Sequence, residues 1–121
     1  MIRWRGAVAK AINGARGQAF LKEMQRALDD LPEHKLVANE LEESGAVCAI
    51  GAVGKARGVD MTKIDPEDSE AVAHLFGISD ALAREIAYMN DEGNYRPETP
   101  EERYFRMRAW VGHHIRDGNM P

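Results

Sequence analysis

The sequence predicts an all-α protein, a compact orthogonal bundle of about six short helices. Apolar residues recur at three- and four-residue intervals in several segments, and glycine or proline separates these segments. The 121 residues match the size of one domain, and a composition of 44% apolar and 30% charged residues is sufficient for a core. Because neither a repeat nor a low-complexity tract divides the chain, we expect residues 1–121 to form a single domain.

The N-terminal segment combines weak helical spacing with an excess of positive charge. Trp4, Val8 and Ile12 follow the helical period, although glycines interrupt the stretch. Residues 1–26 hold six basic side chains and one carboxylate, so this segment carries +5 and the remainder of the chain −9. We expect residues 1–15 to be a basic arm or short helix that packs on the acidic body or stays solvated. Contact with an acidic partner is the alternative.

The next two predicted helices have clearer apolar stripes. The first of them is a core helix, and its buried face consists of Phe20, Leu21, Met24, Ala27, Leu28 and Leu31. The second begins at Pro32, whose fixed φ suits the first helical turn. Gly45 is expected to end that helix in a left-handed conformation. Its buried face is predicted from Leu36, Val37 and Leu41.

Glycine and capping residues define two more helices. The segment 46–57 is rich in alanine and glycine, which predicts a helix with small faces that another helix can approach closely, ending at Gly58. The sequence Asp65-Pro66-Glu67-Asp68 then has the pattern of a helix start, with a capping carboxylate, proline at the first position and acidic residues in the first turn. We expect this helix to run to Gly77.

Two capping signals mark the last two predicted helices. Ser79 is expected to cap the first of them, and the breaker-rich segment 90–94 should end it. Its apolar stripe consists of Ile78, Leu82, Ile86 and Met89. Thr99 and Glu102 have the spacing of a capping box at the start of the final helix. The side of the final helix expected to face the core carries Tyr104, Met107, Arg108, Val111 and Ile115.

Residues 72–86 have the pattern of a helix-turn-helix, with Gly77 at the turn. A second helix that reads DNA needs positive charge and hydrogen-bond donors facing phosphates and base edges. The second helix here offers Arg84 among three carboxylates. We therefore expect this helix pair to serve packing rather than DNA reading.

Cys48 is the candidate nucleophile of the chain. It lies near the start of a predicted helix, where backbone N–H groups would lower a thiol pKa, and His74, His113 or His114 could act as its base. A single cysteine among valine, alanine and isoleucine is more often a small core residue, so Cys48 is only a weak catalytic candidate.

Metal-binding patterns are weaker still. The acidic run 60–70 lacks the glycine-centred spacing of a calcium loop. His113 and His114 are adjacent, so on a helix they point about 100° apart and cannot chelate together. We expect neither a metal site nor a cofactor.

Aromatic and arginine residues predict a protein contact surface. Tyr104 and Met107 can pack inward, which leaves Phe105 towards another face of the last helix. Surplus aromatic residues beside arginine are typical of protein interfaces. The alternative is a last helix buried on more than one side. The residues proposed for the contact are Arg3, Trp4, Arg5, Arg106 and Trp110.

Four short motifs lie between residues 40 and 115: Cys48-Ala-Ile-Gly51-Ala52, Ala56-Arg57-Gly58, Ala87-Tyr88-Met89-Asn90-Asp91 and Thr99-Pro-Glu-Glu102. Together they resemble a family of small uncharacterised proteins from bacteriophages and actinobacteria, with a Cys-x-x-Gly-Ala segment, an aromatic-x-Asn-Asp and a capped final helix. The resemblance implies that Cys48, Gly51, Ala52, Asn90 and Asp91 belong to one structural unit, and it transfers no catalytic residue. The acidic insert 60–70 departs from the family pattern.

We expect binding rather than catalysis. The phage setting that the resemblance implies favours an accessory protein that binds a host or phage protein, for example an inhibitor of host defence such as an anti-CRISPR protein. A thiol-dependent enzyme using Cys48 is the first alternative, and nucleic-acid binding through the basic arm is the second. A second copy of the chain is a further candidate partner.

The sequence also predicts where the protein resides. The N-terminus lacks an apolar stretch of signal-peptide length, and no apolar run is long enough to cross a bilayer. The single cysteine suits a reducing compartment. We therefore expect a cytoplasmic protein without membrane contact, in the host cytoplasm if a phage encodes it.

Overall fold

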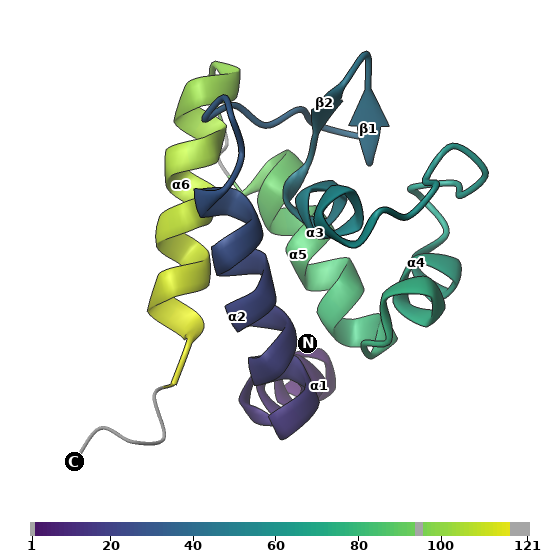
Figure 1. Ribbon diagram of the computed structural model, residues 1–121. Helices are drawn as coiled ribbons and strands as arrows, with labels where there is room; N and C mark the ends of the chain where they lie inside the picture. The colour runs from purple at the N-terminus through teal and green to yellow at the C-terminus, as the bar shows by residue number, and fades with distance from the viewer. Residues whose placement is uncertain (1, 94–95, 117–121) are drawn as a thin grey trace.

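The computed structural model describes residues 2–93 and 96–116, with side chains from Arg5 onward, and the described chain is all-α as predicted (Figure 1). It contains six helices and one two-stranded hairpin. Their bounds are α1 Ile2–Asn13, α2 Ala15–Asp29, β1 Glu42–Glu43, β2 Ala46–Val47, α3 Ala49–Arg57, α4 Ser69–Phe76, α5 Asp80–Glu92 and α6 Pro100–His114.

Helix α2 lies at the centre of the packing. It contacts α1, α3 and α6, and Figure 1 shows α6 beside it while α1 is seen nearly end-on at its lower end. Four of its buried residues are Phe20, Leu21, Met24 and Leu28, as the apolar stripe predicted. Val8 and Ile12 from α1 join the same core, so the N-terminal segment packs on the body as a helix.

The prediction of a helix from Pro32 to Gly45 is wrong, because this segment forms a loop, the first strand of a hairpin and the hairpin turn. Ser44 and Gly45 have φ of +52° and +86°, the two positive values that a tight hairpin turn with the favoured strand twist requires. The turn pairs Glu43 with Ala46. Leu36 and Leu41 are buried as predicted, but from irregular backbone.

Helix α3 begins three residues later than predicted, because Ala46 and Val47 pair in the hairpin and Cys48 becomes the helix cap. The thiol sulfur of Cys48 accepts a hydrogen bond from the backbone N–H of Gly51 at 3.3 Å. At Gly51 the chain that approaches closely is the non-helical segment before the hairpin and not the helix that the sequence predicted, because a Cβ on Gly51 would lie 1.9 Å from the carbonyl oxygen of Leu41. The helix ends at Gly58 with φ +71°, as predicted.

The start predicted for α4 at Asp65 is also wrong, because the cap is Asp68. The Asp68 carboxylate accepts from the backbone N–H of Ala71, whereas the Asp65 carboxylate accepts from that of Glu67 and holds a turn ahead of the helix. The predicted end at Gly77 is confirmed, with φ +73°.

The last two capping predictions are confirmed. Ser79 caps α5 by accepting from the N–H of Leu82, and Thr99 and Glu102 form the reciprocal capping box of α6. Tyr104, Met107 and Val111 face the core, whereas Arg108 forms an ion pair with Asp29 on the surface. Among the described helices, none is both long and apolar enough to cross a membrane.

A candidate binding groove along helix α5

A wide groove of about 750 Å³ runs along the outer side of α5. Helix α5 forms its length, Asn39 and the turn 66–69 form one wall, and Arg5 reaches it from α1. Tyr88 is 54% exposed, which makes it one of the two most exposed large apolar side chains described. We call this surface the α5 groove. Its lining from α5 consists of Arg84, Glu85, Ala87, Tyr88, Met89, Asp91 and Glu92.

A small cavity of about 30 Å³ adjoins the α5 groove. The two hollows share Asn39, Pro66, Ser69, Ala87 and Asp91 in their linings. The apolar part of the cavity lining consists of Leu41, Ile50, Val72, Ala83 and Ile86, together with the thiol of Cys48. The polar part of the cavity lining consists of Asn39, Ser69 and Asp91, which also line the groove, and of Glu40 and Asn90, which line the cavity alone.

Asn90 positions the wall of the groove. Its side chain is 1% exposed, and its Oδ1 accepts a hydrogen bond from the N–H of Ala49 at 3.1 Å. Its Nδ2 donates to the carbonyl of Val37 at 2.9 Å and to the carboxylate of Asp91 at 2.8 Å. A single buried amide therefore connects α5 to the start of α3 and to the loop before the hairpin.

Asp91 completes this connection from the groove side. The same carboxylate oxygen accepts from the backbone N–H of Asn39 at 2.9 Å, and Asn39 has a left-handed φ of +66°. The structure thus brings Cys48, Gly51, Asn90 and Asp91 into one unit at the border of the groove. Carboxylate and amide groups that are already hydrogen-bonded hold the backbone in place and give the site a fixed shape.

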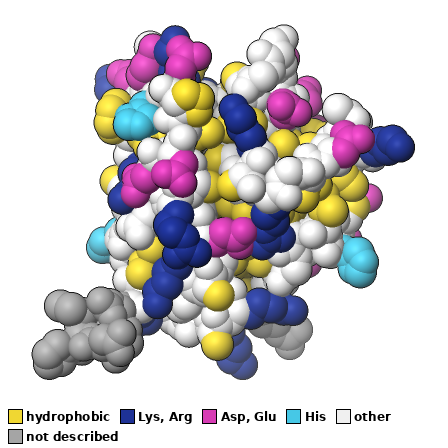
Figure 2. All heavy atoms as spheres, in the orientation of Figure 1, with side chains coloured by type: hydrophobic (Ala, Val, Ile, Leu, Met, Phe, Trp, Pro, Cys, Tyr) yellow, Lys and Arg dark blue, Asp and Glu magenta, His cyan; other side chains and the backbone are white. Residues whose placement is uncertain are grey.

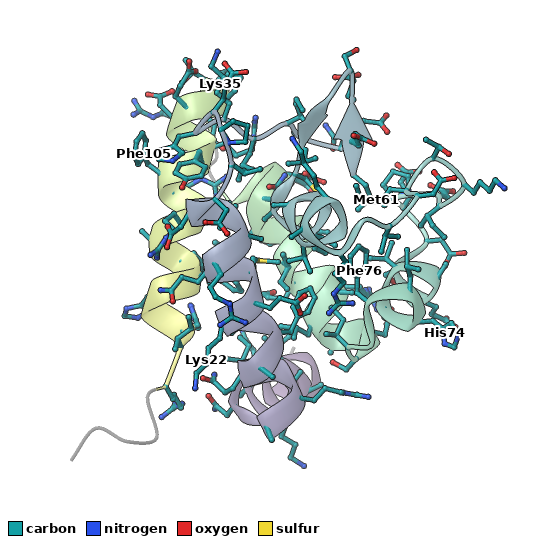
Figure 3. All side chains as sticks on the ribbon, in the orientation of Figure 1. Lys22, Lys35, Met61, His74, Phe76 and Phe105 are labelled. Atoms are coloured by element: carbon teal, nitrogen blue, oxygen red, sulfur yellow. The ribbon has the colours of Figure 1, made fainter. Side chains whose placement is uncertain are left out.

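The Cys48 thiol is in an environment unsuited to nucleophilic chemistry. Burial raises its pKa to about 11, the hydrogen bond from Gly51 opposes this shift, and the negative charge of Asp91 adds to it. A thiol with this pKa holds almost no thiolate at neutral pH. The described lining of the cavity includes no histidine, and His74 points outward from α4 (Figure 3).

The α5 groove is acidic. Glu67, Glu85, Asp91 and Glu92 line it, against Arg5 and Arg84. Within residues 5–93 and 96–116, no basic side chain forms an ion pair with any of these four carboxylates. Arg84 itself lies 3.7 Å from Asp80. The described residues contain no group of three or more histidine, cysteine or acidic side chains arranged to hold a metal ion.

Of the five residues proposed from the sequence for partner contact, the three with described side chains, Arg5, Arg106 and Trp110, lie in different surroundings. Arg5 lines the α5 groove. The side chains of Arg3 and Trp4 lie outside the described part of the structure. Arg106 has a structural role, because its guanidinium donates hydrogen bonds to the Glu98 carboxylate and to the backbone carbonyls of Met89 and Asn90 at the end of α5.

Trp110 and its surroundings on α6 form a separate surface. The indole is half-buried against the core and lies 4.5 Å from the ring of His114. Phe105 is 62% exposed and points away from the molecule on the outer side of α6 (Figure 3). Its ring meets Tyr104 edge-on, and His34 stacks on Tyr104 at 4.4 Å.

The basic residues of the N-terminal segment whose side chains are described lie at the surface. Arg5 and Lys10 on α1 are exposed, as are Arg16, Lys22 and Arg26 on α2. Figure 2 shows dark-blue side chains over the lower half of the molecule, where α1 and α2 lie. The one acidic residue of this N-terminal segment, Glu23 on α2, pairs with Arg57 at 2.7 Å.

Of the residues that line the groove, sequence reasoning proposed only Arg5 as a contact residue and missed the others, among them Tyr88, Asn39 and Ser69. Tyr88 had a detectable signal, because an aromatic residue at a position of α5 that lies off the core stripe calls for an explanation. Asn39 and Ser69 had none, since only the tertiary fold brings the loop and the turn to α5. Comparisons with protein-family models, with curated proteins and with solved structures find no match to this chain.

Proposed function

We propose that this protein binds another protein and accommodates a segment of it in the α5 groove. The observation that carries the proposal is the combination of an open groove, an adjoining apolar cavity and the exposed ring of Tyr88. Concave surfaces with an apolar interior and a few fixed polar groups are the usual form of binding sites. Tyrosine is among the residues that contribute most to protein interfaces.

The geometry gives less support to the two alternative functions, a thiol-dependent enzyme and a nucleic-acid-binding protein. A thiol enzyme needs a thiolate, and the buried Cys48 thiol has its pKa raised to about 11. A nucleic-acid site needs a positive surface, and the α5 groove is lined by four carboxylates against two arginines, so this alternative would have to use the exposed cations of α1 and α2 instead. Phe105 and Trp110 on α6 are a second candidate surface for the same binding function.

The phage setting implied by the sequence resemblance makes a host protein the expected partner, and an inhibitor of host defence is one class that such a binding protein would join. The proposal specifies the binding surface on this protein and does not depend on the identity of the partner. Whatever the partner, it should contact the α5 groove.

The test is capture of a partner from host lysate, identification by mass spectrometry, and measurement of its affinity with purified components. Ala87 is half-buried between groove and cavity, so Ala87→Trp should block the site. Ala109 is exposed on α6, so Ala109→Trp is the matched control. We expect Ala87→Trp to abolish binding and Ala109→Trp to preserve it, with unchanged circular dichroism for both. The reverse pattern would place the contact on α6 and overturn the proposed site.

A further inference from the structure

We infer that the segment bound in the α5 groove is cationic and that it inserts one short aliphatic side chain into the cavity beside Cys48. This inference rests on the proposed function and adds the chemistry of the partner. It follows from two independent properties of the site, the charge along the groove and the size of the cavity.

The charge of the groove is not balanced among the residues whose side chains the structure describes. Glu67, Glu85 and Glu92 have no basic partner among the described residues, and Glu85 is half-buried. Asp91 likewise forms no ion pair with a described side chain, although its carboxylate accepts backbone and side-chain hydrogen bonds. A segment with lysine or arginine side chains would supply the missing positive charges.

The position of these carboxylates on α5 strengthens this argument. The C-terminal end of a helix is its negative end, where basic residues are normally favoured. The last turn of α5 instead holds Asp91 and Glu92 and contains no basic residue. Asp91 has a structural reason to be there, because it binds the loop at Asn39. The exposed side chain of Glu92 forms no hydrogen bond or ion pair within the described residues, and it lines the groove.

The cavity restricts which side chain can serve as an anchor. Its volume of about 30 Å³ is enough for a group comparable with one or two water molecules. Its walls are mostly aliphatic, with Ile50, Val72 and Ile86 among them. An alanine or valine side chain matches both size and polarity, whereas an aromatic ring does not fit without displacement of the walls.

The experiment is selection of random short peptides on the immobilised full-length protein, followed by anisotropy measurements on the enriched peptides. Three variants accompany the native chain: the blocked-groove variant Ala87→Trp, the charge reversal Glu85→Lys/Glu92→Lys, and the control reversal Asp30→Lys/Glu33→Lys. The control changes the net charge equally at two exposed residues after α2, outside the groove lining.

The expected peptides carry lysine or arginine around an alanine or valine, and they lose binding to Ala87→Trp. Their affinity should fall with added salt, and about tenfold in Glu85→Lys/Glu92→Lys but not in the control reversal. Replacement of the central aliphatic residue by tryptophan should weaken binding by a similar factor.

The other outcomes separate the two proposals. Groove-dependent peptides without basic residues, or with an aromatic anchor, would overturn this inference and leave the proposed function standing. Absence of any peptide that depends on the groove would overturn the proposed function as well. Self-association of the native chain that Glu85→Lys/Glu92→Lys abolishes would identify a second copy as the occupant and overturn the short-segment inference.

Discussion

The side chain of Asn90 accepts a hydrogen bond from the backbone N–H of Ala49 at 3.1 Å, across 41 residues of sequence. This bond fixes the start of α3 against the end of α5, and the Asn90 amide nitrogen fixes Val37 as well. The shape of the α5 groove wall therefore depends on the buried side-chain amide of Asn90.

Asn90→Ala should lower the free energy of unfolding by about 3 kcal/mol, because the N–H of Ala49 and the carbonyl of Val37 would lose their buried partner. Chemical denaturation with urea measures this change. His74→Ala, at an exposed position on α4, is the control and should change stability by less than about 0.5 kcal/mol. A loss below about 1 kcal/mol for Asn90→Ala would contradict a structural role for this amide.

Arg106→Ala should destabilise the fold by about 3 kcal/mol, because it removes one of the arginines that pair with the Glu98 carboxylate, whose side chain is 5% exposed. It also removes donors from the carbonyls of Met89 and Asn90. Thermal unfolding is the measurement, and Lys35→Ala, which removes an exposed ion pair, is the control. If Arg106→Ala instead keeps native stability but no longer binds the partner protein, Arg106 would be a contact residue, as the sequence predicted.

Gly51→Ala should cost about 2 kcal/mol, since its Cβ would lie 1.9 Å from the carbonyl oxygen of Leu41 and force the loop away from α3. Gly6→Ala is the matched substitution on α1, where a Cβ meets nothing within 4 Å. It should leave stability unchanged or raise it by about 0.5–1 kcal/mol through helix propensity. Equal effects of the two substitutions would contradict the close approach at Gly51.

The pKa of Cys48 predicts a specific pH dependence of stability. The folded thiol has its pKa raised by burial from about 9 to about 11, so folding favours the neutral form. This contribution is fully present below pH 9 and is lost as pH rises towards 11, a change of about 2–3 kcal/mol. Urea unfolding of the native chain and of Cys48→Ser across this range isolates the effect, because serine retains a capping oxygen and does not titrate.

Alkylation of Cys48 tests the same environment from the chemical side. The reaction should be slow in the folded protein at neutral pH and fast once urea unfolds it, because the thiolate is scarce and shielded. A thiol-dependent enzyme would instead show a transition in rate well below about pH 8.5. That result would revive the catalytic alternative.

The sequence predicted the elements whose ends are determined locally. Ser79, Thr99 and Gly77 act on backbone groups within a few residues of themselves, so capping rules were enough to place them. The same rules misplaced the start of α4, because Asp65 and Asp68 both suit a cap and only the fold decides which one is used.

The hairpin was missed for a different reason. Leu36 and Leu41 are buried, as they would be on the apolar face of a helix. Their segment is instead held against β2 and the start of α3 by two backbone hydrogen bonds, in which the N–H of Val37 donates to the carbonyl of Val47 and the N–H of Cys48 donates to the carbonyl of Leu41. These long-range bonds leave no periodic signal. The α5 groove was unpredictable on the same ground, since Arg5 and Asn39 reach it from segments far from α5 in the sequence.

The most direct test of the groove is a map of amide chemical-shift changes in the labelled protein on titration with the partner segment. We expect the largest changes along the groove, at Asn39, Ser69, Tyr88 and Asp91. We expect none of comparable size on α6, at Phe105 and Ala109. Changes confined to α6, with the groove residues unaffected, would contradict the account and assign binding to the exposed aromatic surface of the last helix.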